Sequence, residues 1–280
     1  MTRRRLVGII GGAVVLGACI GTYVMATDDS HDGTVAGKEL PTGKTITPAA
    51  ARGAFFQDLN PGHQALPAQR AQQAAAISVS PDGKLAAILT SGFNRHFGKD
   101  GKPVPELSTE YVFLFDMTTP QPKQIQVLPI PNSFQGLAWA PSGDRFYASG
   151  GKDDDVLEFV RSASRFAAGR TFRLGHHEGI GLKARWGSSD INVEAVAGAL
   201  AVSPDGTRLL ATNFQNDSVS LIDLRSGQVA TEQDLRPGII DPKRHGQPGG
   251  SFPRCAIWVS PNHAYIGSER DREIVSLTIS

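Results

Sequence analysis

A proline-centred turn recurs along this chain at nearly regular intervals. Its intact copies are Ser203-Pro204-Asp205-Gly206 and Ser80-Pro81-Asp82-Gly83, and its altered copies are Ala140-Pro141-Ser142-Gly143 and Ser260-Pro261-Asn262-His263. The four prolines lie 60, 63 and 57 residues apart. A short apolar run precedes each turn and further strand-like runs follow it. Repetition at this period indicates one supersecondary unit used several times, and units of several short strands are typical of β-propeller blades.

The repeat therefore predicts an all-β fold of the β-propeller class. Residues 219–224 carry apolar side chains on both faces, which fits a strand between two neighbouring sheets. The last unit ends after its third strand, so we expect an incomplete, unclosed ring whose apolar end faces promote association. The four blades are expected at about residues 75–128, 136–174, 198–236 and 254–280.

Composition narrows the class of protein further. The chain has 31 glycines and 18 prolines, which suits a β fold rich in turns. Its 28 basic side chains nearly balance 27 acidic ones, so the basic surface that nucleic acid requires is not expected. The only cysteines are Cys19 and Cys255. Cys255 lies in an apolar strand pattern, and we predict a buried thiol there.

The N-terminus has the pattern of an export signal. Residues 6–26 carry no charge and follow three consecutive arginines. This pattern fits a cleaved signal peptide, a lipoprotein leader with Cys19 as the lipidated residue, or a retained membrane anchor. All three alternatives place the remainder outside the cytoplasm, in the periplasm or at the cell surface. Residues 27–50 are polar and aperiodic, which predicts a flexible tether before a partial propeller at 51–280.

Strand parity predicts which face of the propeller carries a binding site. In an antiparallel blade, the turns between the second and third strands share one face with the crossings to the next blade. The proline-centred turns occupy the opposite face and are short. Long insertions on one end of a rigid scaffold are where binding residues concentrate. All four insertions fall on the first face, at residues 91–109, 129–135, 175–197 and 237–253.

Polar side chains in these loops and turns are the candidate ligand-binding residues. A metal bound by His176, Glu178 and a histidine from another loop is one alternative. Adjacent histidines do not have a ligand spacing, however, so we expect neither a metal nor another cofactor. Trp139 and Trp258 are predicted to pack in the core. The candidate residues are Arg95, His96, His176, His177, Glu178, Arg185, His245 and Arg270.

One stretch carries a specific resemblance. Residues 201–213, followed by Asp217-Ser218-Val219-Ser220-Leu221-Ile222-Asp223, resemble the YVTN repeat of bacterial extracytoplasmic β-propellers. From Phe56 onward the chain is similar to the propeller half of YncE-like propeller–phosphoesterase proteins. The resemblance implies a propeller with more blades than four. The phosphoesterase half is missing from this chain, so no metal-site residue of that domain is carried over.

The sequence favours a binding function over a catalytic one. It contains no GxSxG elbow, CxxC pair or HExxH motif, so we predict no catalytic residue. The leading hypothesis is an exported, non-catalytic docking module that binds a small molecule, glycan or protein on the long-loop face. The alternatives are a lactonase-like hydrolase acting on a sugar lactone and a haem-binding propeller.

Overall fold

The computed structural model describes residues 38–39, 42–43, 45–46, 57–64, 66–92, 96–98, 100–177 and 195–280. The chain divides into two compact units, Met1–Gln57 and Asp58–Ser280. In the first unit, β1 (Lys38–Glu39) pairs antiparallel with β2 (Thr45–Ile46). The proposed leader, including Cys19, lies outside the described residues. Within the described part, no helix is long and apolar enough to span a membrane.

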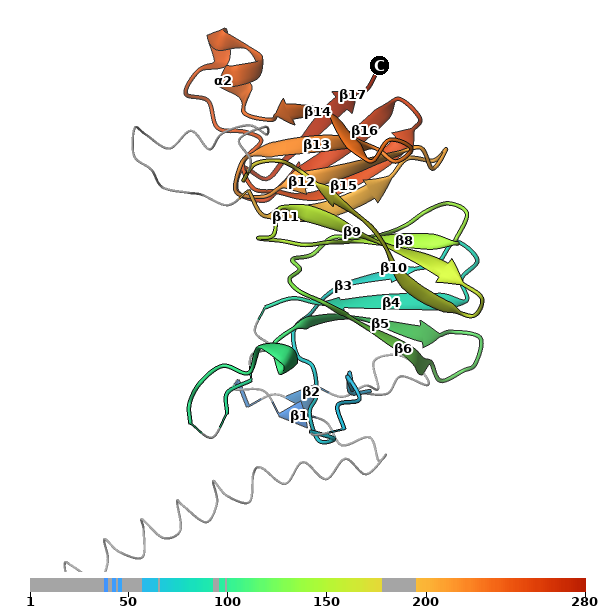
Figure 1. Ribbon diagram of the computed structural model, residues 1–280. Helices are drawn as coiled ribbons and strands as arrows, with labels where there is room; N and C mark the ends of the chain where they lie inside the picture. The colour runs from blue at the N-terminus through green and yellow to red at the C-terminus, as the bar shows by residue number, and fades with distance from the viewer. Residues whose placement is uncertain are drawn as a thin grey trace, which may run out of the picture. The chain divides into compact units, whose positions relative to one another are not determined.

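The second unit consists of four antiparallel sheets in which strands pair in chain order (Figure 1). This arrangement confirms the predicted all-β propeller with four blades. Short helices α2 (Pro237–Ile240), η2 (Pro105–Leu107) and η3 (Pro242–Arg244) lie in the loops. Blade one contains β3 (Ala74–Val79), β4 (Leu85–Thr90), β5 (Glu110–Asp116) and β6 (Lys123–Ile130); blade two contains β7 (Leu137–Trp139), β8 (Arg145–Ser149), β9 (Asp155–Ser162) and β10 (Arg165–Arg173); blade three contains β11 (Ala197–Val202), β12 (Arg208–Asn213), β13 (Ser218–Asp223) and β14 (Gln228–Asp234); blade four contains β15 (Pro253–Ser260), β16 (His263–Ser268) and β17 (Glu273–Thr278).

In the intact proline-centred turns, an aspartate accepts hydrogen bonds that hold the turn, as Asp205 shows. The Ser203 hydroxyl donates to Asp205 Oδ1 at 2.5 Å, and the Thr207 N–H donates to the same oxygen at 3.0 Å. These hydrogen bonds hold the pKa of Asp205 at about 2. The next residue, Gly206, has a φ of 73°, a conformation that costs a side-chain-bearing residue energy. Local turn chemistry thus sets the connection between the first two strands of the blade.

The core lies between the sheets. We call the face of a blade that points to the preceding blade its front, and the opposite face its back. The back of blade one packs against the front of blade two, and blades two to four continue in the same way. Trp139 donates its indole N–H to the Ser78 carbonyl at 3.1 Å, and Trp258 donates to the Ala201 carbonyl at 3.0 Å. Both tryptophans are buried, which confirms their assignment to the core.

The row of sheets is not closed, as predicted. Among the described residues, β17 pairs only with β16, so its outer edge is open. At the other end, Leu59 and Ala71 pair with each other and pack on the front of blade one. The prediction of a buried thiol at Cys255 is wrong. Cys255 is exposed because it lies on the back of blade four, which no further sheet of the described residues covers.

Candidate functional site

A buried histidine joins blades two and three on the long-loop face. His176 follows β10, and its Nδ1 lies 2.6 Å from Asp154 Oδ1. Its Nε2 lies 2.9 Å from Glu232 Oε1 on β14. Glu232 also accepts hydrogen bonds from the Ser218 hydroxyl at 2.5 Å and the Asn213 amide at 3.0 Å. The imidazole is therefore clamped between two carboxylates from neighbouring blades.

The clamp fixes the charge of His176. Burial opposes a positive charge, but hydrogen bonds and charges from Asp154 and Glu232 outweigh it and raise the pKa to about 9. At neutral pH the ring is an imidazolium with both N–H groups donating to carboxylates. Such a ring has no lone pair with which to accept a proton or bind a metal. His176 is thus a structural cation.

Asp154 also has a structural role that does not depend on the His176 ring. It lies in the turn between β8 and β9 with a φ of 57°, and its Oδ2 accepts the His176 backbone N–H at 2.7 Å. Asp217 occupies the equivalent turn of blade three with a φ of 53°, and its Oδ1 accepts the Phe252 N–H at 2.9 Å. The same device therefore secures two successive blade crossings. The left-handed backbone conformation at Asp154 and Asp217 is therefore a shared feature of the repeated unit.

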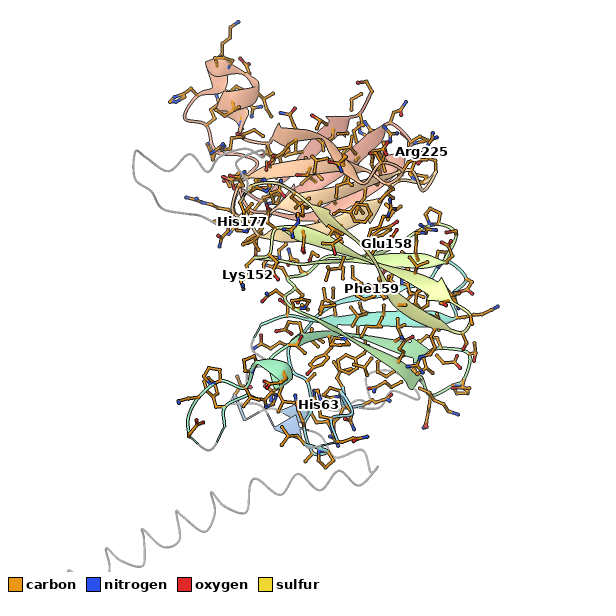
Figure 2. All side chains as sticks on the ribbon, viewed as in Figure 1. His63, Lys152, Glu158, Phe159, His177 and Arg225 are labelled. Atoms are coloured by element: carbon orange, nitrogen blue, oxygen red, sulfur yellow. The ribbon has the colours of Figure 1, made fainter. Side chains whose placement is uncertain are left out.

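The remaining candidates have separate surroundings. His177 Nε2 lies 3.0 Å from the Lys152 carbonyl, and Figure 2 labels both residues. His96 contacts the Gln69 side chain at 2.6 Å beside blade one. His245 lines a pocket between blades three and four, and Arg270 is exposed at blade four. The structure thus joins His176 and His177 to one cluster and places the other described candidates elsewhere. Arg95, Glu178 and Arg185 lie outside the described residues.

A row of aromatic side chains, missed in the sequence, connects three blades on the long-loop face. Phe134 precedes blade two, and its ring centroid lies 5.0 Å from that of Phe214, in the turn after β12. Phe214 stacks on Phe252, which precedes blade four, at 5.0 Å and an interplanar angle of 21°. The Arg270 guanidinium lies 5.8 Å from the Phe252 ring centroid. The three rings are half-buried, so their edges reach the surface beside a cation.

A pocket adjoins this face at the crossing from blade three to blade four. It has a volume of about 330 Å³ and is lined by Ile239, His245, Gln247 and Arg236, among others. Hydrogen bonds with Asp234 hold the Arg236 guanidinium and raise its pKa. The pocket therefore combines an apolar wall with a fixed cation and a histidine.

A second pocket, of about 340 Å³, lies on the opposite face between the turns of blades two and three. Burial raises the pKa of Tyr147, one of its lining residues, to about 12. Arg145 in its wall is already paired with Asp144 and Glu158. Strand parity predicted a binding site on the long-loop face only. This pocket on the opposite face is therefore the alternative binding site. It presents Arg225 as an exposed cation.

Within the described ranges, no group of three histidine, cysteine or carboxylate side chains is arranged to hold a metal ion. The alternative metal site drew on Glu178, which lies outside those ranges. In the other residue of that set, His176, both ring nitrogens face carboxylates.

The four successive antiparallel sheets define the class of protein as a β-propeller, and the comparisons with known proteins give no particular relative. No protein-family model matches the chain, and no curated protein matches it. A protein from Lactobacillus plantarum has a similar structure, with a TM-score of 0.53 and 10% identity over 90% of this chain and 61% of that one. The β-propeller domain of a Myceliophteria thermophila protein gives 0.47 and 12%, covering 74% and 54%. A periplasmic gluconolactonase of Pseudomonas aeruginosa gives 0.43 and 13%, covering 75% and 72%.

These likenesses concern the fold alone. The chain spans between 54% and 61% of the length of the first three similar structures. What those whole proteins do is therefore not transferred to it.

Proposed function

We propose that this chain is an exported, non-catalytic β-propeller whose long-loop face binds a small molecule, glycan or protein. The observation that carries the proposal is the clamp on His176. The candidate histidine His176 is held as a cation between Asp154 and Glu232. A group with a pKa of about 9 and two occupied nitrogens is a poor general base at neutral pH.

The same face offers the features of a binding surface. The row Phe134–Phe214–Phe252 presents half-buried aromatic rings, and Arg270 adds a cation over the Phe252 ring. The pocket around His245 and Arg236 supplies a concave surface next to the blade crossing. Rigid aromatic groups with a few fixed polar groups are typical of ligand recognition.

We further propose that the chain belongs to the YVTN-repeat propellers and is related to the propeller half of the propeller–phosphoesterase proteins. The support is the repeat at residues 201–213 and 217–223, together with the likeness after Phe56. Residues 6–26 support export, with Cys19 as the candidate for lipidation. In the described part of the chain, no residue favours the lactonase or the haem alternative.

Enzyme assays separate a binding module from a lactonase. Purified protein is incubated with gluconolactones, and acid release is followed against the spontaneous rate. The proposal predicts the spontaneous rate for wild type and for Arg270→Ala alike. Saturable hydrolysis that Arg270→Ala or His245→Ala reduces would contradict it. A visible absorption band of the purified protein would instead support a haem propeller.

Export has its own test. A fusion of alkaline phosphatase to the C-terminus is active only in an oxidising compartment. We expect an active fusion, and an inactive fusion that is stably expressed would contradict export. If Cys19 is lipidated, Cys19→Ser abolishes labelling by palmitate, whereas persistent labelling excludes that alternative.

A further inference from the structure

The back of blade four is built like a surface that another blade covers. Strand pairing places Ile257 opposite Tyr265 in blade four, as it places Ala201 opposite Leu210 in blade three. Tyr265 and Leu210 therefore occupy equivalent positions. The same register makes Ile274 the equivalent of Val219.

Equivalent positions differ sharply in exposure. On the back of blade three, Leu210 and Val219 pack against blade four, and Val219 is 3% exposed. On the back of blade four, Ile257 is 60% exposed and Ile274 is 74% exposed. A row of large apolar side chains at core positions is thus left in contact with solvent. Apolar rows of this kind mark association surfaces.

The blade junctions within the chain are of two kinds. At the first and third junctions, the front face of the following blade contributes a tryptophan. Its indole N–H donates to a carbonyl of the preceding blade, that of Ser78 or Ala201. The second junction has Val202 at the tryptophan position, as its pairing with Leu209 shows. There the back contributes Tyr147, which packs in the same cluster as Val202 and Leu209. The order along the chain is therefore tryptophan, tyrosine, tryptophan.

The two end faces carry the two halves of a tyrosine junction. Tyr265 on the back of blade four is equivalent to Tyr147, because each pairs with the residue that directly precedes the tryptophan of the first strand in its blade. On the front of blade one, Val79 pairs with Ala86 and is thereby equivalent to Val202. Joining the two end faces would continue the alternation. Head-to-tail contact between chains is the arrangement that brings them together, since the row of sheets formed by the described residues of one chain is open.

The front of blade one leaves room for this contact at its inner strand. The segment 58–71 covers the outer strands, where Asn60 bonds Gln124 and His63 bonds Tyr111. Ile77 and Val79 on β3 remain exposed at 68% and 52%. Docking therefore engages β15 and β16 of one copy and β3 of the other, with Ile257 and Tyr265 against Val79.

We propose that the back of blade four binds the front of blade one in a second copy of this chain. Two copies joined at both ends bring eight blades together, which is within the range of about four to eight for closed propellers. Each junction joins the back of one copy to the front of the other, and a two-fold axis generates the second junction from the first. Its residues are distinct from those of the long-loop face, so its failure would leave the proposed binding function standing.

Sedimentation velocity of the purified protein across a dilution series tests the proposal. We expect wild type to sediment with twice the mass of the 29.8 kDa chain. Ile257→Asp and Val79→Asp each damage both junctions of the closed pair, so each variant alone is expected to be monomeric. Ile240→Asp, at an exposed isoleucine on α2, is the matched control and is expected to remain dimeric.

Mixing the two monomeric variants tests whether the contact runs from the back of one copy to the front of the other. A Val79→Asp chain keeps its back intact and an Ile257→Asp chain keeps its front intact, so the mixture is expected to regain a dimer with one good junction. Circular dichroism of each variant confirms folding. A monomeric wild type overturns the proposal. A dimer that Val79→Asp leaves intact also overturns it, because that result would mean contact between two copies of blade four or another surface.

Discussion

The indole Nε1 of Trp258 donates to the backbone carbonyl of Ala201 at 3.0 Å, and this hydrogen bond crosses from blade four to blade three. The indole also fills the core cluster between the two sheets. We expect Trp258→Phe to lower the free energy of unfolding by about 1–3 kcal/mol, because the indole donor and part of the packing are lost and the Ala201 carbonyl loses this partner. Urea unfolding measures the change. An unfolding curve identical to that of wild type would show that blade four contributes nothing to the stability of the unit.

The clamp on His176 predicts a dependence of stability on pH. Its pKa is raised from 6.5 to about 9 on folding, so the stabilisation is fully present below pH 6.5 and is lost as the pH rises through 9. We expect His176→Gln to lose about 3 kcal/mol at pH 6, since two buried carboxylates lose their cation. The deficit shrinks above pH 9. Thermal melts between pH 6 and pH 10 give the comparison, and a deficit that is constant with pH would contradict the imidazolium assignment.

For Asp155, removing the ionisable group is expected to stabilise the protein rather than destabilise it. Burial, with a contribution from Asp153, raises its pKa to about 6, and its buried Oδ1 has no hydrogen-bond partner among the described residues. The folded state therefore favours the protonated acid, and stability falls as the pH rises from about 4 through 6 and then levels off. Asp155→Asn is expected to stabilise the protein at pH 8, on the order of 1 kcal/mol given its partial exposure. Equal melting temperatures of variant and wild type at pH 8 would count against this reasoning.

The proline-centred turn gives a prediction about stability alone. Gly206 has a φ of 73°, so Gly206→Ala is expected to cost about 1–2 kcal/mol. Asp205→Ala removes three hydrogen bonds that the carboxylate accepts in the same turn and is expected to be destabilising by about 1 kcal/mol. Chemical denaturation measures both. Neither change is expected to alter ligand binding on the long-loop face.

The repeat predicted the strands and turns well because their causes are local. Asp205 and Gly206 shape their turn through neighbours within a few residues, and the apolar runs beside such turns become paired strands. Four blades and an open end followed from the spacing of the prolines. These features could be predicted without knowledge of distant contacts.

The site could not be predicted to the same extent, because its contacts join residues far apart in the chain. His176 was predicted to be a ligand-binding residue, but its carboxylate partner Glu232 comes from the next blade. The row from Phe134 to Phe252 lies in loops and turns on the long-loop face, but nothing local in the sequence indicates that rings from three blades meet there. Cys255 has the pattern of a buried strand residue and is exposed because no blade among the described residues covers it.

The central claim, that the long-loop face binds the ligand, is tested most directly by crystallographic fragment screening of the intact protein. The account predicts that fragments gather at the edges of Phe134 and Phe252 and in the pocket beside His245. Arg270→Ala should weaken binding of these fragments in solution at least several-fold, whereas Arg225→Ala, at the pocket on the opposite face, should leave it unchanged. Fragments confined to the pocket beside Arg225, with binding lost in Arg225→Ala, would contradict the account.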